Sequence, residues 1–446
     1  MEAYVLDTDL KTIGVIDNYN SFIWTERYAE AGDFELNIPA SVELVKLLKQ
    51  DRYLRIADSN EIMIIEGIAI KTENNAPHMT VTGRSLVSIL DRRVILGTRY
   101  FNATGVDGAE MDKNVWQIVR TIVDENAITP ENNPLNVNTG DEHLKDYNTM
   151  MKNNRRFNNL QAPDEDYYNN NSIANPYNKI TIKKPTNIQF NGETLYDAVK
   201  SICDKYHLGF AISDYSKFPG FSSDKSFVFY IYDGQNRTSG QKEKSDHSYN
   251  TPVILSPLFE NVANISYASS TNGLKTILLA VGEESGKGDT PGLRPYAIVD
   301  NKGNAVGYAT DYPDQIDASK EPSDLELREA IQDISSEVVM DGDSSSVQPQ
   351  DLNDEQYNKA LINRAFDILN DSNKALDAFD GELVNNENYK VKRDYDLGDI
   401  IEMSDGLGHS KWMRVTEIIY SHNSSGYKIY PTLALYEKDQ FEQRDE

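Results

Sequence analysis

The sequence is poor in cysteine and in basic residues, and each shortage excludes a class of protein. Its 446 residues include one cysteine, Cys203, so no disulfide can form within the chain and no zinc site of cysteine pairs is expected. Acidic residues outnumber basic ones by 71 to 44, which gives a formal net charge of −27. A surface of this charge repels nucleic acid and anionic membranes, so we expect neither specific DNA or RNA binding nor membrane insertion.

Long hydrophobic runs are absent as well. The chain has no window of about 18 apolar residues, which is the length that a membrane-spanning helix requires. Residues 1–17 lack the basic start and the apolar centre of a signal peptide. We therefore expect synthesis in a cytoplasm, without export by the general secretory route.

Motifs of catalysis and cofactor binding are also missing. The six histidines do not form HExxH, and no GxSxG nucleophile elbow occurs. Residues 282–290 lack the spacing of a phosphate-binding loop, and residues 300–307 lack the ligands of a calcium loop. Cys203 lies beside the apolar stripe of a predicted helix, which favours a core residue over a nucleophile. We expect no enzyme, no cofactor and no metal, although a carboxylate pair assembled in space would leave no signal among so many acidic residues.

Alternating apolar and polar residues dominate both ends of the chain. In TERYAEAGDFELNIPAS, residues 25–41, the apolar Phe34, Leu36 and Ile38 alternate with polar residues until Pro39 ends the run. A period of two indicates a strand with one apolar face. Similar runs at a spacing of about 8 to 12 residues favour a β-barrel or sandwich over a parallel α/β sheet.

Helical periodicity appears between these β-rich parts. Apolar residues three and four positions apart, with capping boxes at Thr194 and Ser323, predict helices in the middle of the chain and in a later insert. The predicted helices are residues 85–95, 114–125, 194–206, 323–338 and 354–379. Residues 128–179 are rich in Asn and Tyr and lack a period, so we expect a long loop there.

Together the patterns predict an α+β, mainly β fold with several domains. Two β-rich domains are expected, separated by an α+β domain and by a helical insert that packs on it. A strand near 226–233 is a candidate for completing the first β domain. The expected boundaries are 1–97 for the first β domain, 98–249 for the α+β domain with its loop, 250–315 plus 385–440 for the second β domain, and 316–384 for the helical insert.

Two stretches, one near each end, carry a more specific pattern. The first is Trp24-Thr-Glu-Arg27-Tyr28 followed by Gly32-Asp33-Phe34-Glu-Leu. The second runs from Tyr389 to Ile400 through Asp396-Leu397-Gly398-Asp399 and continues in WMRVTEIIYSHNSSGYKIYPTL, residues 412–433. In this order they resemble the tail-hub proteins of siphophages, tail-associated proteins whose N-terminal region is similar to the baseplate hub of contractile phages. The predicted helices in 193–213 and 352–370 fall where that family has its helices.

The resemblance implies a structural virion protein of the tail tip or baseplate. Such hubs carry two related β-barrels per chain, similar to tail-tube subunits, and a homotrimer presents six barrels in a ring. The ring joins the six-fold tail tube, or a distal tail protein, to the three-fold tip or spike protein, and it also meets the tape-measure protein. Phage DNA passes through the bore without specific binding, and acidic side chains on its wall would repel phosphate.

The same motifs supply residues expected to shape the barrels or to assist assembly. Gly32 is expected to adopt backbone angles that other residues avoid, and Asp33 to cap the turn. Asp396, Gly398 and Asp399 are expected to act in the same way before a strand at residue 400. Because aromatic residues and arginine are enriched at interfaces, a contact of Trp24, Arg27 and Tyr28 with a neighbouring subunit is a further hypothesis. The full set is Trp24, Arg27, Tyr28, Gly32, Asp33, Phe34, Asp396, Leu397, Gly398 and Asp399.

Two other functions stay open at this point. Some tail-associated proteins carry a peptidoglycan hydrolase or endopeptidase domain after the hub, but here the last predicted strand lies close to Glu446, so we expect no added catalytic domain. The tyrosine-rich residues 147–177 could stack on sugars, as a receptor- or carbohydrate-binding protein would require. A loop that contacts neighbouring tail proteins is the simpler interpretation of that tract.

Overall fold

The computed structural model describes most of the chain. The described residues are 1–73, 76–103, 109–134, 142–163, 185, 188–214, 226–241, 248–282, 296–300, 305–308, 322–335, 361–369 except 363 and 367, 376–383 and 389–436. Among these residues, no helix is both long enough and apolar enough to cross a bilayer. Two compact units are present, Met1–Ile265 with Gly381–Glu446 and Ser266–Asp380, and each is described by itself.

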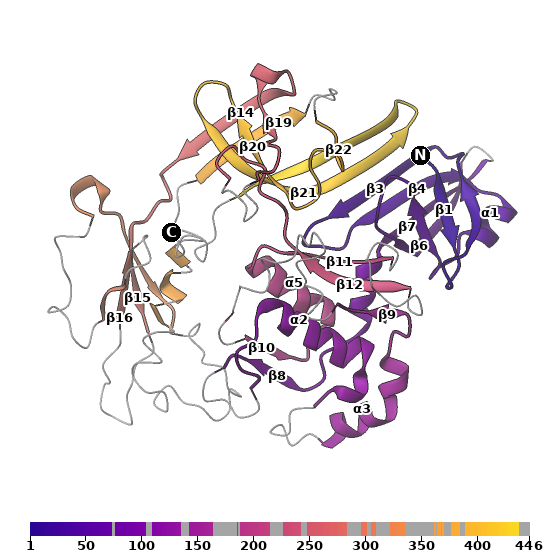
Figure 1. The fold of residues 1–446 in the computed structure, drawn as a ribbon, viewed down its shortest axis with the longest axis horizontal. Coiled ribbons are helices and arrows are strands. Elements are labelled where there is room, and N and C mark those ends of the chain that lie inside the picture. The colour runs from indigo at the N-terminus through magenta and orange to yellow at the C-terminus, as the bar shows by residue number, and fades with distance from the viewer. Residues whose placement is uncertain are drawn as a thin grey trace. The chain divides into compact units, whose positions relative to one another are not determined.

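An 11-stranded sheet in the first unit joins strands from both ends of the chain (Figure 1). Its strands are β1 Ala3–Leu6, β2 Thr12–Ile16, β3 Ser21–Arg27, β4 Asp33–Pro39, β5 Tyr53–Ile56, β6 Met63–Glu73, β7 Ala76–Ser85, β13 Ile254–Leu255, β20 Ile400–Ser404, β21 Ser410–Asn423 and β22 Gly426–Leu435. They follow the order β13-β20-β21-β3-β4-β7-β6-β5-β1-β2, and β22 pairs with β21. The sheet is antiparallel except where β13 meets β20.

The N-terminal strands bury one apolar face, as their alternation predicts. The rings of Trp24 and Phe34 stack with centroids 6.1 Å apart, and Phe22 meets both rings edge-on. Offset and edge-to-face contacts suit the charge distribution of aromatic rings. A short helix, α1 Val42–Leu47, follows β4, and the Ser41 side chain caps its first turn.

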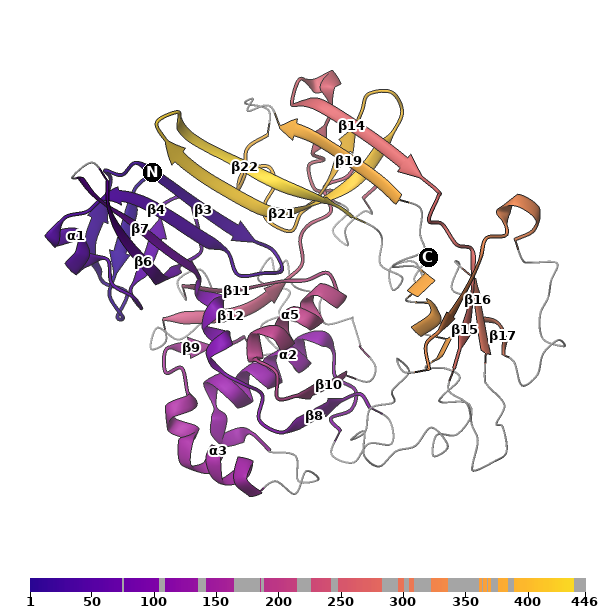
Figure 2. The ribbon, with the colours of Figure 1, turned by 180° about the vertical axis from the view of Figure 1, so that it is seen from behind.

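Helices and two small sheets form the middle of the first unit, and Figure 2 shows α2 and α5 next to β11 and β12. The elements are η1 Leu86–Arg92, β8 Thr98–Phe101, α2 Val115–Val123, η2 Asp124–Ile128, η3 Pro130–Asn132, α3 Glu142–Arg155, β9 Leu160–Gln161, β10 Ile188–Asn191, α5 Leu195–Lys205, β11 Gly209–Asp214 and β12 Phe227–Tyr232. The small sheets are β11-β12-β9 and β10-β8. The apolar stripes of α2 and α5 pack with Phe210 and Phe229 in one core.

The second unit has its own sheet and core. Its elements are β15 Ile277–Val281, β16 Tyr296–Asp300, β17 Ala305–Tyr308, η8 Asp324–Glu326 and β18 Glu329–Asp333, with the strand order β17-β16-β15-β18. Helical residues between 361 and 369 bury Leu361, Ala365 and Leu369 against Leu278 on β15. A separate pair, β14 Val262–Ser270 and β19 Leu376–Leu383, contains both boundaries between the units. One further short element, η7 Pro257–Phe259, precedes β14.

Several sequence predictions are confirmed. The fold is mainly β with helices, and the predicted helices at 85–95, 114–125 and 194–206 are found as η1, α2 and α5. Thr194 caps α5 through a hydrogen bond from the backbone N–H of Asp197, as its capping pattern predicts. The strand expected at residue 400 is β20.

The strand pairing differs from the expectation of two separate barrels. In the part of the chain that the structure describes, β2 and β22 each pair with one strand, so these ladders do not close a barrel. The strand at Phe227–Tyr232 does not complete the N-terminal sheet but pairs with β11 and β9. The C-terminal strands β20 to β22 join the N-terminal strands, whereas β15 to β17 form the sheet of the second unit.

Two helix predictions near the end of the chain are wrong in part. Residues 329–333 form β18, which pairs in parallel with β15 and whose side chains alternate in exposure. This pairing outweighs the apolar spacing that predicts a helix over residues 323–338. Residues 376–379 belong to β19 rather than to the end of a helix at 354–379, although described residues from 361 to 369 are helical. In both places pairing with a distant strand outweighs local helical propensity.

Part of the polar tract predicted as a loop is a helix. Residues 142–155 form α3, whereas residues 164–179 of the tract lie outside the described residues. α3 has few apolar residues and is anchored by polar side chains: Asn148 and Arg155 are buried on its inner side. A search for apolar periodicity does not detect a helix that is held in this way.

Candidate functional site

Pairing between the two ends of the chain brings the two sequence motifs together. β3 runs antiparallel to β21, so that Trp24 lies opposite Tyr420 and Arg27 opposite Glu417. Residues 389–399 lead directly into β20, which also pairs with β21. The candidates from both ends therefore form one junction inside the first unit.

Tyr28 is at the centre of this junction. Its hydroxyl donates to the backbone oxygen of His207 at 2.9 Å and accepts a hydrogen bond from Nη1 of Arg414, also at 2.9 Å. The same Nη1 atom donates to the backbone oxygen of Gly398 at 2.9 Å, and the guanidinium carbon lies 4.8 Å from the centre of the Tyr28 ring. Burial raises the pKa of Tyr28 well above its usual value, so the phenol stays protonated and can donate.

Glycines allow the backbone to approach Tyr28 closely. Gly398 has a φ of +87°, and a Cβ atom there would lie 2.3 Å from Cε2 of Tyr28. A Cβ atom at Gly209 would lie 2.6 Å from the same ring. Gly234 lies directly against Gly398: a Cβ atom added at Gly234 would lie 1.7 Å from the Gly398 oxygen. The expectation that Gly398 adopts an unusual backbone angle is confirmed.

The two aspartates beside Gly398 hold backbone and side-chain groups. Asp399 is buried, and it accepts hydrogen bonds from the backbone N–H of Gln235 at 2.8 Å and from Nε of Arg237 at 2.6 Å. Asp396 accepts from the backbone N–H of the buried Leu397 at 2.7 Å and forms an ion pair with Lys392 at 2.8 Å. These contacts fix the turn that precedes β20.

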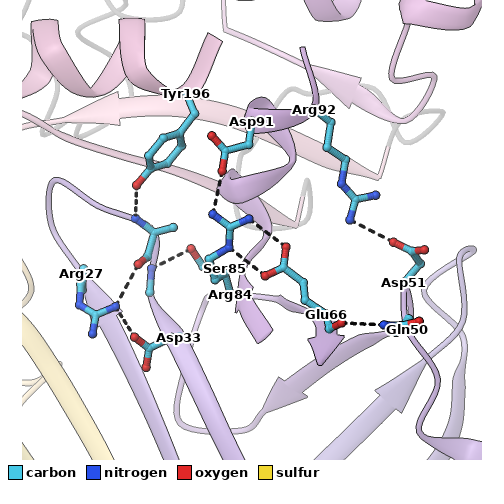
Figure 3. A network of polar contacts seen from close by, with 12 residues as sticks. Arg27, Asp33, Gln50, Asp51, Glu66, Arg84, Ser85, Asp91, Arg92 and Tyr196 are labelled. Atoms are coloured by element: carbon cyan, nitrogen blue, oxygen red, sulfur yellow. Dashed lines mark hydrogen bonds and ion pairs between the residues drawn. The ribbon is translucent and has the colours of Figure 1, made fainter. Parts of the chain in front are cut away.

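The N-terminal candidates have different roles from those expected. Gly32 does not have a left-handed φ; it is required because a Cβ atom there would lie 2.2 Å from the Thr25 oxygen. Asp33 does not cap a turn but forms an ion pair with Arg27 (Figure 3). Phe34 is a core residue on β4.

Burial contradicts the hypothesis that the aromatic residues reach a neighbouring subunit. Trp24 is fully buried, and Tyr28 is 3% exposed. Their rings are enclosed by residues of the same chain, so neither can contact another subunit in this conformation. Arg27 keeps partial exposure but is held by Glu417, with 2.7 Å between Nε and the carboxylate.

A buried carboxylate links the two motifs. Glu26 is 1% exposed and accepts hydrogen bonds from Ser59 Oγ and, at 2.9 Å, from Nζ of Lys392. Ser59 in turn accepts from Trp24 Nε1 at 3.2 Å. Lys392 has a φ of +68°, which is unusual for a residue with a side chain. An ion pair between the buried Glu26 carboxylate and the partly exposed Lys392 therefore connects the N-terminal strand to the C-terminal motif.

A second buried carboxylate, Glu61, lies near Glu26. Its Oε2 atom has no hydrogen-bond partner. Burial raises the pKa of Glu61 well above its usual value, and the negative charge of Glu26 raises that pKa further. The folded protein therefore favours the protonated form of Glu61.

Replacing Glu61 with glutamine should remove a pH-dependent loss of stability. Because the folded-state pKa exceeds the unfolded-state pKa, the folded state of the natural protein binds more protons between these two values. The stabilisation that Glu61 gives the folded state is complete below the pKa of Glu61 in the unfolded chain. This stabilisation is lost as the pH rises toward the pKa of Glu61 in the folded protein. We expect Glu61→Gln to exceed the natural protein in free energy of unfolding at pH 8, and the difference to shrink as the pH falls. Urea unfolding at a series of pH values measures this difference.

Glu43→Gln is the matched control, because Glu43 is an exposed residue of α1. The control should follow the natural protein at every pH. Equal stability of Glu61→Gln and the natural protein at pH 8 would show that the Glu61 carboxylate is not destabilising in the fold.

A second set of ion pairs surrounds the outer face of β6 and β7 (Figure 3). Arg84 binds both oxygens of Glu66, at 2.8 and 3.0 Å, and also binds Asp91 at 2.7 Å. Arg92 pairs with Asp51 at 3.0 Å. These arginines are therefore neutralised by carboxylates of the same chain.

Sequence reasoning did not single out several residues of the junction. Glu26 and Lys392 lie inside the quoted motifs, and Glu26 shares its buried face with Phe22 and Trp24 at a spacing of two, which was a usable signal. Glu61 lies outside the motifs, and Arg414 lies in the last part of the second motif. No local pattern marks either residue, so only the three-dimensional pairing identifies them.

The junction has the features of a structural joint. In the described part of the chain, no group of three or more His, Cys, Asp or Glu residues could hold a metal. Cys203 is buried, and burial raises the pKa of its thiol. Such a thiol is a poor nucleophile, because the thiolate is the reactive form.

Comparison with known proteins places the chain in a family. A family model described as Siphovirus ReqiPepy6 Gp37-like protein matches residues 2–433. A search of curated proteins found no match.

Similar solved structures include three bacterial or prophage tail proteins. They are the 43 kDa tail protein of prophage MuSo2 from Shewanella oneidensis (11% identity, TM-score 0.47, 97% of this chain and 98% of that chain), the tail protein from Neisseria meningitidis MC58 (10%, 0.45, 98% and 96%) and the prophage tail protein gp18 from Listeria monocytogenes EGD-e (11%, 0.41, 99% and 95%). At these TM-scores the likenesses add no argument, and the assignment depends on the family model. Because that model spans nearly the whole chain, the protein belongs to the Siphovirus ReqiPepy6 Gp37-like family, and the resemblance to siphophage tail proteins is confirmed.

Proposed function

We propose that this protein is the structural hub of a siphophage tail tip, in which three copies form a ring around the path of the DNA. Membership of the tail-protein family supports a structural role. The observation that carries the ring is the main sheet: it combines strands from both ends of the chain and has two long unpaired edges.

The first unpaired edge is the outer half of β6. Its inner half pairs with β5 at Met63 and Ile64, whereas residues 67–73 have β7 on one side and no strand on the other among the described residues. Ile68 and Ile70 lie opposite the buried Val81 and Met79, yet they are 37% and 51% exposed. The apolar face thus continues to an edge that this chain leaves uncovered.

The second unpaired edge is β22. This strand, Gly426–Leu435, pairs with β21 along its length and, within the described residues, has no strand on its other side. Tyr427 and Tyr430 are exposed on it. Exposed strand edges pair readily with other chains unless they are blocked. Pro431 lies within β22 and has no N–H to donate, so the part of this edge best suited to pairing is Gly426–Tyr430.

Pairing of β22 in one copy with β6 in the next is a head-to-tail contact, and such a contact forms a ring when the rotation between copies closes. In this proposal β3, β4, β6 and β7 represent one tube-like unit, and β20, β21 and β22 with β13 represent the second. Three copies then supply six units, which match a six-fold tube or distal tail protein above and a three-fold tip or spike below. The tape-measure protein is a further partner that this location implies.

The solvent face of the N-terminal strands suits the wall of a DNA channel. Glu35 lies opposite Thr82, and Asn37 opposite Thr80, on the face turned away from the core. Arg27 on this face is held between Asp33 and Glu417. Such a wall of hydroxyl, amide and carboxylate groups attracts phosphate weakly. Lys71, opposite His78 near the end of β6, is an exposed cation on the same face.

Adding cations to this face should make the protein retain DNA. We expect the triple variant Glu35→Lys, Thr80→Lys, Thr82→Lys to bind duplex DNA at about 50 mM NaCl, where the natural protein does not, because each lysine attracts phosphate. Electrophoretic mobility shift with a short duplex measures the effect.

The control places the same charge change on α1, as Val42→Lys, Glu43→Lys, Val45→Lys. In a ring, lysines outside the bore should retain DNA far less than lysines inside it. Equal retention by both variants would contradict the assignment of this face to the channel.

The test of the proposal is a mass measurement by light scattering together with negative-stain images. We expect particles of three chains with a central hole. A stable two-fold dimer or an open filament would overturn the hub proposal.

No observation on the described residues favours a second function. The tyrosine-rich tract, residues 147–177, is described only up to residue 163, and the helix α3 occupies its first part. A lytic band in a zymogram would favour a cell-wall hydrolase, and binding to a glycan array would favour a receptor-binding protein.

A further inference from the structure

The sheet of the second unit has an exposed edge at β18. This strand pairs in parallel with β15 on one side, and no strand of the described residues pairs with it on the other. Ile331 at its centre is 68% exposed, and Leu327 just before it is 38% exposed. The strands of the proposed ring contact, β6 and β22, belong to the first unit, so this edge is a separate surface.

The backbone of β18 offers hydrogen-bonding groups to a further strand. The backbone oxygen of Arg328 and the backbone N–H of Ile334 both bond to β15, at 3.3 and 2.9 Å. Successive residues of a strand direct their backbone groups to opposite sides, so the even-numbered residues of this stretch face β15. The N–H and C=O groups of Glu329, Ile331 and Asp333 therefore point to the open edge.

The side chains along this edge alternate between apolar and acidic. Leu327 is already extended, and every second residue from it onward lies on one exposed face: Leu327, Glu329, Ile331 and Asp333. The residues between them turn the other way, and Ala330 packs against the core of the unit. A strand added to this edge would therefore meet apolar and acidic side chains in turn.

Acidic groups also dominate the surroundings of the edge. Asp324 and Glu326 on η8 are exposed and add their charge to that of β18. Among the described residues of 271–282 and 322–335, the cations are Lys275 and Arg328. The Arg328 side chain is half-buried, and its Nη1 atom donates to the backbone oxygen of Thr271. The local field therefore favours a cationic partner.

A second copy of β18 is a poor match for this edge. Two antiparallel registers set Ile331 opposite an apolar residue of the other copy. Pairing about Ile331 sets Glu329 opposite Asp333, and pairing about Glu329 sets two Glu329 side chains opposite each other. Like charges directly opposite each other destabilise a strand pair, so a strand of different sequence fits better.

We propose that β18 pairs with an extended segment of another protein in which every second residue is alternately apolar and basic. Its apolar side chains lie beside Leu327 and Ile331, and its lysine or arginine side chains lie beside the carboxylates. Apolar pairs and pairs of opposite charge both stabilise neighbouring strands. Addition of a strand to an open sheet edge is a recurrent mode of peptide recognition, with affinity from the main chain and specificity from alternate side chains. The inference does not depend on ring formation.

The experiment uses the full chain and a fluorescein-labelled peptide of about nine residues, Thr-Val-Thr-Lys-Thr-Val-Thr-Lys-Thr, which models such a segment. Fluorescence anisotropy at about 50 mM NaCl should show binding that weakens at higher salt. A peptide of the same composition, with its two lysines adjacent and its two valines adjacent, is the control for sequence order. It should bind about fivefold more weakly or less, because its lysines and valines cannot all meet their counterparts.

Two variants of the protein test the edge itself. Glu329→Lys should weaken binding by about fivefold or more, because an attractive cross-strand pair becomes a repulsive one. Glu43→Lys, the same charge change on the exposed surface of α1, is the matched control and should alter the affinity by less than about twofold. Ile331→Pro removes an N–H that points away from β15 and should weaken binding by about tenfold or more, while thermal unfolding stays cooperative.

Three results would overturn the proposal. The first is no binding of the alternating peptide by the natural protein. The second is equal binding of the two peptides, which would show a general attraction between charges. The third is equal affinity of the Glu329→Lys and Glu43→Lys variants for the alternating peptide, which would place the binding site away from β18.

Discussion

Replacing Gly398 with alanine is expected to lower the free energy of unfolding by about 2–5 kcal/mol, from two separate costs. The first cost is the backbone: a φ of +87° is unfavourable for a residue with a Cβ atom, by about 1–2 kcal/mol. The second cost is steric, because the new methyl group would lie 2.3 Å from the Tyr28 ring. Relief of that overlap would cost a further 1–3 kcal/mol or so.

The steric cost has consequences beyond Gly398 because Tyr28 cannot move freely. Gly209 also packs against the Cδ2–Cε2 edge of the ring, and the Tyr28 hydroxyl is held by His207 and Arg414. A displaced ring would break the hydrogen bond to Arg414, whose buried side chain would lose a partner. We therefore expect the variant to weaken the contact between the two ends of the chain.

Gly408→Ala is the matched control for the backbone cost. Gly408 has a φ of +110°, and a Cβ atom there would meet nothing within 4 Å. Its substitution should cost about 1 kcal/mol, and the difference between the two variants measures the overlap with Tyr28. Urea unfolding followed by tryptophan fluorescence reports both values. If the two variants were equally stable, the close packing of Gly398 on Tyr28 would be refuted.

The sequence predicted which residues form this junction better than it predicted the contacts that those residues make. Gly398 and Asp399 stood out because glycine and aspartate before a strand are typical of turns. Their partners, Tyr28 and Arg237, come from distant segments and depend on a strand pairing between β3 and β21 that no local pattern specifies. Short-range sequence rules could therefore predict that these residues form a turn. The contacts that each residue makes could be identified only from the fold.

The same division explains the errors in the fold. α2 and α5 were predictable, because their apolar stripes repeat at the helical period and are buried as a set. β18 was not, because its strand conformation depends on the parallel pairing with β15. α3 was missed for the opposite reason: polar contacts rather than an apolar stripe hold it. Patterns thus predict elements that bury their own apolar face and miss those defined by a distant partner.

Introducing charge at the exposed edge of β6 is expected to abolish ring formation. In the double variant Ile68→Asp, Ile70→Asp, each interface would lose two apolar side chains and gain two carboxylates at a site that assembly must dehydrate. We expect the concentration required for assembly to rise at least about a hundredfold, because desolvated charges without partners are strongly unfavourable at an interface. Sedimentation velocity over a range of concentrations measures this shift, and circular dichroism checks that the monomer stays folded.

The edge strand β2 supplies a matched control that separates a specific contact from a general loss of apolar surface. Ile13 and Val15 are exposed to a similar extent, 40% and 49%, and they also alternate along a strand with a single neighbour. Ile13→Asp, Val15→Asp should leave assembly unchanged, because β2 is not an edge that the proposed ring uses. Assembly that survives in the β6 variant but fails in the β2 variant would move the subunit contact from β6 to β2, the last strand at this end of the sheet. The contact between neighbouring copies in the ring would then have to be formed by β2 instead of β6.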